Sequence, residues 1–166
     1  MKTDYIALSS RITEVLADAE RVVSRAEFLL DKAKNNNDDS YMDGIALNLH
    51  SFYTGVERIF EDIARTVDQS VPSGQNWHRD LLLQMSASSG MRQPVISRET
   101  RYCLDEYRGF RHLVRNIYTF NLKPSRLSEL TLQLRQCYHR VADDLQEFVK
   151  FLEQLADRSN SKETTL

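Results

Sequence analysis

The sequence predicts an all-α fold, an up-and-down helical bundle of four long helices plus one short helix. Glycine and proline, which interrupt helices, number only five and three in 166 residues. Apolar side chains recur at spacings of three and four, which places them on one face of a helix, and no segment shows the alternation of a β-strand. We expect one domain over residues 1–157 and a flexible C-terminal tail over residues 158–166.

The first two helices are predicted at 4–34 and 41–68. The stripe of the first includes Ile12 and Val23, and the run NNNDDS ends it, because Asn and Asp side chains favour turns. The second helix has an equally regular stripe, which includes Phe52 and Ile59. These two helices therefore form a hairpin with apolar faces turned to a common core.

The remaining helices are predicted at 77–86, 98–119 and 125–157. The loop QSVPSGQNW precedes the short helix, and SASSGMRQPVIS is expected to be a second, more mobile connection. Ser97 is placed to cap the next helix, and Pro124 lies where it must end. The last helix has a long seam of leucines at spacings of three and four, typical of a bundle core.

Charge and hydropathy exclude several classes of protein. The net charge of −2 gives no general attraction to nucleic acid or anionic lipid, so any anion site must be a local cluster. No apolar run approaches the roughly 20 residues that a membrane helix needs. We therefore expect a cytoplasmic protein with no membrane contact. Cys103 and Cys137 show no metal-ligand spacing and are interpreted as reduced core residues, with a disulfide as the alternative.

Polar side chains gather on one face of the fourth expected helix, around the stretch RHLVRNIYTFNL at 111–122. At about 100° per residue, Arg108, Arg111, Arg115 and Tyr118 fall within about 80° of one another, and the opposite side is apolar. Asp105 is the only acidic residue on that side, so the arginines have no obvious partners one turn away. A guanidinium binds two phosphate oxygens at once, so this face suits an anion. A solvated helix face is the alternative.

Two longer stretches, YRGFRHLVRNIYTFNL and LHSFYTGVERIFEDIARTVDQSVPSGQNWHRDLLLQM, resemble a known family. They are similar to the HepT-like ribonuclease toxins of the HEPN superfamily, whose motif is an arginine, four residues, a histidine, one residue and a tyrosine. Arg111 and Tyr118 stand in the arginine and tyrosine positions, and Asn116 stands where the motif has histidine. The resemblance covers most of residues 45–125.

This resemblance implies a homodimer that cuts RNA without a metal, in a cleft where the two motif helices meet. It also implies an MNT-type minimal nucleotidyltransferase antitoxin as a partner, which in some pairs transfers AMP onto the motif tyrosine, here Tyr118. The added AMP brings bulk and a negative phosphodiester to the mouth of the cleft, and both oppose RNA entry. No cofactor and no metal are expected.

Asparagine at position 116 changes the expected chemistry. Metal-free cleavage needs a group that takes the proton of the ribose 2′-OH and positive charge for the developing phosphorane. Asn116 cannot titrate, although it can orient a phosphate or a hydroxyl. We therefore expect Arg111 to be the cationic catalytic residue, His112 to be the candidate base, and Arg108 and Arg115 to bind RNA.

Two other functions are compatible with the residues. One is a catalytically degenerate HEPN domain that binds RNA, nucleotide or a protein partner without cleavage, and the other is a plain helical dimerisation module. His50 and Glu57 can share a helix face, although an ordinary core or surface histidine is the simpler interpretation. Trp77 and His78 are interpreted as the anchor of a loop, with a contribution to the RNA cleft as the alternative.

Overall fold

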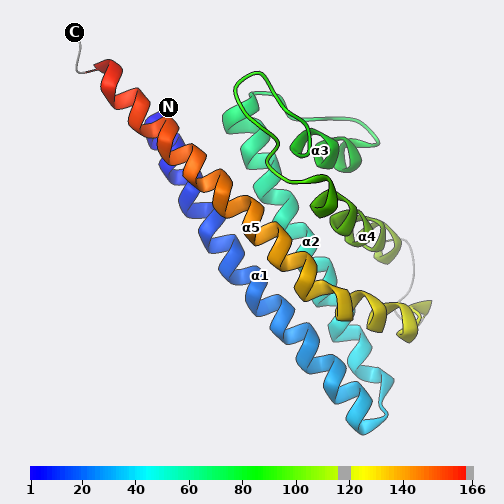
Figure 1. Ribbon diagram of the computed structural model, residues 1–166. Helices are drawn as coiled ribbons and strands as arrows, with labels where there is room; N and C mark the ends of the chain where they lie inside the picture. The colour runs from blue at the N-terminus through cyan, green and yellow to red at the C-terminus, as the bar shows by residue number, and fades with distance from the viewer. Residues whose placement is uncertain (116–120, 164–166) are drawn as a thin grey trace.

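The computed structural model describes residues 1–115 and 121–163, with side chains to residue 161. Its elements follow the predicted order, and the all-α class is confirmed (Figure 1). In chain order they are α1 (Lys2–Asn36), a 3-10 turn η1 (Asp39–Tyr41), α2 (Met42–Ile63), a π-helical turn η2 (Ala64–Asp68), α3 (Trp77–Met85), α4 (Arg98–Val114) and α5 (Pro124–Glu163).

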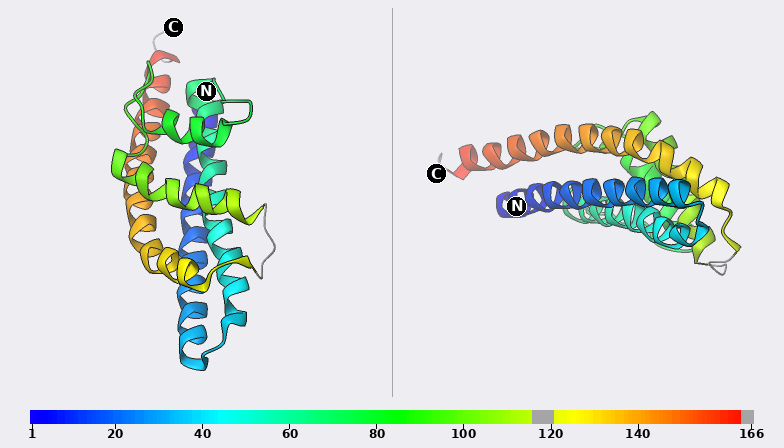
Figure 2. Two further views of the ribbon diagram at one scale, coloured as in Figure 1. Left: turned by 90° about the vertical axis from the view of Figure 1, so that its right-hand side faces the viewer. Right: turned by 90° about the horizontal axis from the view of Figure 1, so that it is seen from below.

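The three helices α1, α2 and α5 run side by side along the long axis of the molecule (Figure 1). Helix α1 packs along both α2 and α5. Helix α3 packs on α2 and α4, and α4 packs on α2, α5 and α3. Both of these helices cross the long axis on one side of the bundle (Figure 2). The start of α3 therefore lies next to α4, on the side of the bundle that these two helices cover.

Aromatic side chains join α4 to the bundle. The rings of Phe52 on α2 and Tyr107 on α4 pack edge to face, with their centroids 5.5 Å apart. The Tyr107 hydroxyl donates a hydrogen bond to the carbonyl of Leu130 on α5 at 2.8 Å, which satisfies its buried polar atom. Burial is the main cause that raises the pKa of Tyr107, so this phenol stays protonated. These contacts fix the apolar side of α4 and leave its opposite side to solvent.

The helix ends follow local chemistry. Ser97 caps α4, since its hydroxyl accepts a hydrogen bond from the backbone N–H of Thr100 at 3.1 Å. Pro124 occupies the first position of α5, where its missing N–H costs nothing. This helix continues through Glu163, so residues 158–163 lie within it, beyond the predicted helix end at residue 157. The described part of α4 ends at Val114, and the rest of the predicted range 98–119 is described only at Arg115.

The expectation that Cys103 and Cys137 are reduced was wrong. The two residues form a disulfide between α4 and α5, with their Cα atoms 5.7 Å apart, an ordinary separation for such a bond. Helical spacing placed each cysteine near the apolar side of its own helix. It did not reveal that the two residues face each other, because this depends on how the two helices pack.

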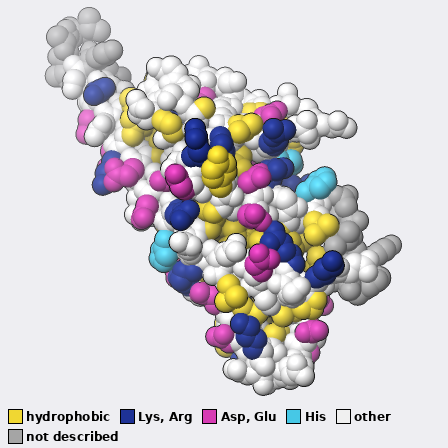
Figure 3. Space-filling model, turned by 45° about the vertical axis from the view of Figure 1, so that its right-hand side comes forward, with side chains coloured by type: hydrophobic (Ala, Val, Ile, Leu, Met, Phe, Trp, Pro, Cys, Tyr) yellow, Lys and Arg dark blue, Asp and Glu magenta, His cyan; other side chains and the backbone are white. Residues whose placement is uncertain are grey.

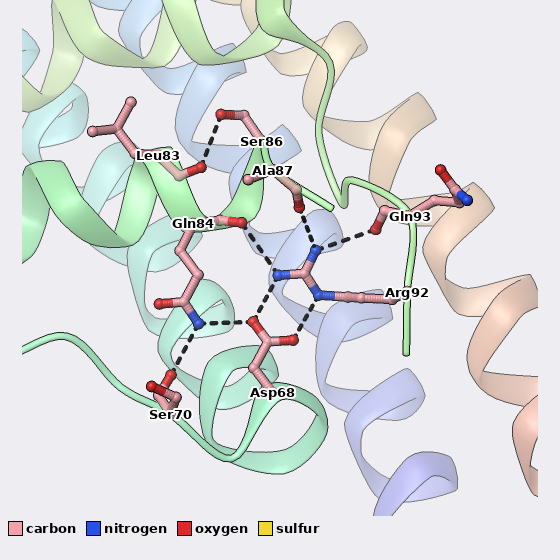
Figure 4. Close-up of polar contacts among 8 residues, drawn as sticks. All are labelled: Asp68, Ser70, Leu83, Gln84, Ser86, Ala87, Arg92 and Gln93. Atoms are coloured by element: carbon pink, nitrogen blue, oxygen red, sulfur yellow. Dashed lines mark hydrogen bonds and ion pairs between the residues drawn. The ribbon is translucent and has the colours of Figure 1, made fainter. Parts of the chain in front are cut away.

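The connection between α3 and α4, which was expected to be more mobile, is hydrogen-bonded to the bundle through Arg92 (Figure 4). The Arg92 Nε and Nη2 atoms donate to the two carboxylate oxygens of Asp68 at 2.7 and 2.6 Å. Its Nη1 atom donates to the carbonyls of Ala87 and Gln93, and Nη2 also donates to the carbonyl of Gln84. The side chains of Arg92 and Asp68 are only 1% and 4% exposed. We call these five residues the Arg92 cluster.

Candidate functional site

An open pocket of about 550 Å³ lies between the start of α3 and the second half of α4. The described residues that line it include four arginines, two histidines and no carboxylate. They are Gln75, Asn76, His78, Arg79, Arg108, Arg111, His112 and Arg115. Figure 3 shows arginine or lysine and histidine side chains close together on this face. The pocket is therefore a local basic cluster on a chain whose net charge is −2.

Helix α4 supplies half of this lining. Arg108, Arg111, His112 and Arg115 follow one another at helical spacing, so their side chains project to one side, as the sequence pattern predicted. The buried Phe110 and Tyr107 hold the opposite side of the helix against the bundle. All four predicted α4 residues within the described part of the chain thus line one pocket.

A chain of hydrogen bonds connects the pocket to a buried carboxylate on α2. The buried Glu57 carboxylate accepts a hydrogen bond from His78 at 2.8 Å, between Oε2 and Nδ1. On the other side of the imidazole, Arg111 Nη1 lies 3.3 Å from His78 Nε2. Because arginine only donates, Nε2 must accept, and the ring proton therefore lies on Nδ1 and points to Glu57. We call this arrangement the Glu57–His78–Arg111 chain.

The positive charge of the pocket acts on the neighbouring His50 of α2. Burial, Arg111 and Arg115 all lower the pKa of His50, and only Glu57 opposes them. His50 is therefore more easily kept neutral than a free histidine. Burial and the neighbouring Glu57 raise the pKa of Tyr53, so this phenol remains protonated beside the carboxylate. Both shifts favour the neutral forms of these two side chains next to Glu57.

A family model described as HepT-like protein matches residues 44–152. The chain belongs to the HepT-like family, which is of the HEPN type. The matched residues include Glu57, His78 and Arg111, and with them the whole of the hydrogen-bonded chain. No curated protein and no solved structure matches the sequence.

Among the residues that the structure describes, no group of three or more His, Cys, Asp or Glu side chains is placed to hold a metal ion. In the same part of the chain, no helix has both the length and the apolarity required to cross a membrane.

The structure corrects the expectation that the α4 arginines have no partners one turn away. Arg108 Nε donates to Asp105 at 2.7 Å, so this guanidinium is already shared with a carboxylate. Arg111 differs, because its partner is an imidazole and its buried Nε atom has no hydrogen-bond partner within residues 1–115 and 121–161. Two other predicted site residues, Asn116 and Tyr118, lie outside the described residues.

Sequence reasoning did not select Glu57 or His78 as site residues. Trp77 does anchor the segment, as expected, since it packs against the core. Its ring also stacks on the imidazole of His78 at a centroid distance of 3.6 Å. A signal was available for His78, since it falls in one of the two stretches that carried the family resemblance. Its pairing with Glu57 depends on where α3 packs on α2, which periodicity does not give.

Proposed function

We propose that this HepT-like chain is a metal-independent endoribonuclease of a toxin–antitoxin pair. The observation that carries the proposal is the pocket lined by four arginines and two histidines without a carboxylate. RNA presents a phosphodiester to such a surface, and guanidinium forks bind its oxygens with charge-assisted hydrogen bonds. A neutral or cationic ligand gains nothing comparable there.

The proposal gives each predicted residue a role. Arg111 lines the pocket beside His78, and its charge stabilises the phosphorane that develops during transfer of the phosphoryl group. Arg108 and Arg115 bind the phosphates that flank the cleaved one. His112 lines the same pocket and is the base candidate on α4. Asn116 orients the phosphate or the 2′-OH.

Regulation and assembly belong to the same proposal. The chain acts as a homodimer in which the two motif helices meet and both pockets face a common cleft for RNA. An MNT-type nucleotidyltransferase antitoxin transfers AMP onto Tyr118, and the new phosphodiester then competes with RNA for the arginines. Intact-mass measurement after incubation with ATP and the antitoxin detects this modification, and a Tyr118→Phe variant that gains the same mass would exclude Tyr118 as the acceptor.

A second function, RNA or nucleotide binding without cleavage, is favoured by Asn116 in the motif histidine position. The two functions separate when the natural chain and Asn116→His are incubated with RNA in the presence of EDTA. Cleavage by the natural chain supports the nuclease. Cleavage by Asn116→His alone supports the degenerate domain. Unchanged cleavage by His112→Ala removes His112 as the base.

A further inference from the structure

The Glu57–His78–Arg111 chain contains two residues, Glu57 and His78, that belong neither to the family motif nor to α4. His78 belongs to α3, Glu57 to α2 and Arg111 to α4, and the three side chains meet at the inner wall of the pocket. We propose that His78 is the general base that takes the proton of the ribose 2′-OH, the role that Asn116 cannot fill. This inference rests on the proposed nuclease function.

The imidazole is fixed in the orientation that a base needs. Glu57 holds Nδ1–H at 2.8 Å from a carboxylate that is only 4% exposed, and Trp77 stacks on the ring. The remaining nitrogen, Nε2, therefore carries the lone pair and is directed to Arg111 at the wall of the pocket. The same carboxylate stabilises the imidazolium that forms once Nε2 has taken a proton. Glu57 is thus a positioning residue for His78.

Arg111 brings the phosphate to this base. Its Nη1 donates to His78 Nε2 at 3.3 Å, and its buried Nε has no acceptor among the described residues. An unsatisfied guanidinium donor favours an incoming oxygen ligand, and a phosphate offers two oxygens in the required fork. When Arg111 turns its donors to the phosphate, Nε2 loses its hydrogen bond and is free to accept the 2′-OH of the adjoining ribose. Binding and activation are therefore coupled through one side chain.

The proposed step is balanced without a metal or a redox partner. The proton of the 2′-OH passes to His78 Nε2, and the 2′ oxygen forms a bond to phosphorus. The bond between phosphorus and the 5′ oxygen of the next nucleotide breaks, and that oxygen takes a proton from water. The hydroxide left from this water is neutralised by the proton that the imidazolium releases. The products are a 2′,3′-cyclic phosphate and a 5′-hydroxyl end.

The test compares two asparagine substitutions in the full-length protein. In His78→Asn the side-chain amide keeps a donor for Glu57 but has no group at the Nε2 position. The matched control is His139→Asn, at an exposed histidine of α5 outside the pocket. Cleavage is measured on an end-labelled random-sequence RNA pool in EDTA, and affinity is measured on the same pool with 2′-O-methyl groups, which cannot be cleaved.

We expect His78→Asn to lower the cleavage rate by about 100-fold or more, with affinity changed by less than about threefold. His139→Asn is expected to match the natural chain. Added imidazole is expected to restore part of the rate of His78→Ala, which a merely structural histidine does not allow. Glu57→Gln is expected to lower kcat by about tenfold and to leave KM nearly unchanged, because it removes the charge but keeps an acceptor for Nδ1–H.

The possible outcomes distinguish the inference from the function on which it rests. If the natural chain cleaves and His78→Asn cleaves equally well, the base is another group and the nuclease proposal stands. Loss of affinity together with cleavage makes His78 a binding residue and overturns its role as a base. If the natural chain binds the pool without cutting it, the nuclease proposal itself is wrong, and the base with it. His78→Gln replaces His78→Asn if circular dichroism shows that the latter is unfolded.

Discussion

Arg92 and Arg111 are both held within the α3–α4 side of the bundle, but their surroundings differ in one respect. Arg92 meets a buried carboxylate and three backbone carbonyls, so each of its three nitrogen atoms donates to at least one acceptor (Figure 4). Arg111 meets an imidazole that is itself held by Glu57, and one of its donors has no partner in the part of the chain that the structure describes. A saturated guanidinium can only stabilise the fold. One with spare donors can also bind a ligand.

Because of this difference, the two arginines are expected to contribute unequally to the stability of the fold. Removing one partner of a buried ion pair leaves an uncompensated charge, whereas removing Arg111 leaves His78 still hydrogen-bonded to Glu57. Substitutions in the Arg92 cluster are therefore expected to lower the stability of the fold. Substitutions in the Glu57–His78–Arg111 chain are expected to affect RNA binding.

Arg92→Ala is expected to lower the free energy of unfolding by about 3–5 kcal/mol, because it leaves the Asp68 carboxylate buried and unpaired. Urea denaturation followed by circular dichroism measures this change. The control is Arg126→Ala, which removes ion pairs at a side chain that is 40% exposed and should cost less than about 1 kcal/mol. Equal effects of the two substitutions would contradict the assignment of Arg92 as a buried anchor.

Cys137→Ser is expected to lower the free energy of unfolding by about 3–4 kcal/mol, since the disulfide closes a segment of 34 residues in the unfolded chain. Because Cys103 lies on the same helix as Arg111, this substitution also tests whether the pocket needs the covalent link. Non-reducing denaturation measures stability, and RNA affinity is measured in parallel. A stability that is the same with and without reductant in the natural protein would contradict the prediction.

Arg111→Met is expected to change the free energy of unfolding by less than about 1 kcal/mol, in contrast to Arg92→Ala. RNA affinity should fall by about tenfold, and the salt dependence of binding should decrease by about one counterion. Arg115→Ala should show the same loss of salt dependence, because it too removes a cation from the pocket lining. Titration of a 2′-O-methyl RNA pool at several salt concentrations measures these changes. Unaltered affinity in both variants would favour a plain dimerisation module.

The smallest expected effect concerns His50, whose pKa is lowered by burial, Arg111 and Arg115. As the pH falls below about 6.5, the unfolded chain takes up this proton before the folded protein does, so folding stability decreases. His50→Gln is expected to remove that decrease. In Arg111→Met the pKa of His50 should rise, which NMR titration of the imidazole measures. An unchanged pKa would mean that Arg111 does not act on His50.

The sequence was sufficient for those parts of the site that lie on a single helix. Arg108, Arg111, His112 and Arg115 share one side of α4 because helical spacing alone sets their directions, and this was predicted. The disulfide and a contribution of His78 to the cleft were considered only as alternatives, because both depend on contacts between different helices. The register between α3 and α2, or between α4 and α5, is set by the packing of whole apolar faces, and one sequence does not reveal it.

The position of His78 near the start of α3 has a consequence for variation among related chains. The imidazole follows the loop over residues 69–76, whereas Glu57 and Arg111 lie within helices that the bundle fixes. An insertion or deletion in that loop displaces one partner of the three and leaves the others unmoved. The length of this loop, and not only the identity of the polar residues, therefore determines whether a homologue retains the Glu57–His78–Arg111 chain.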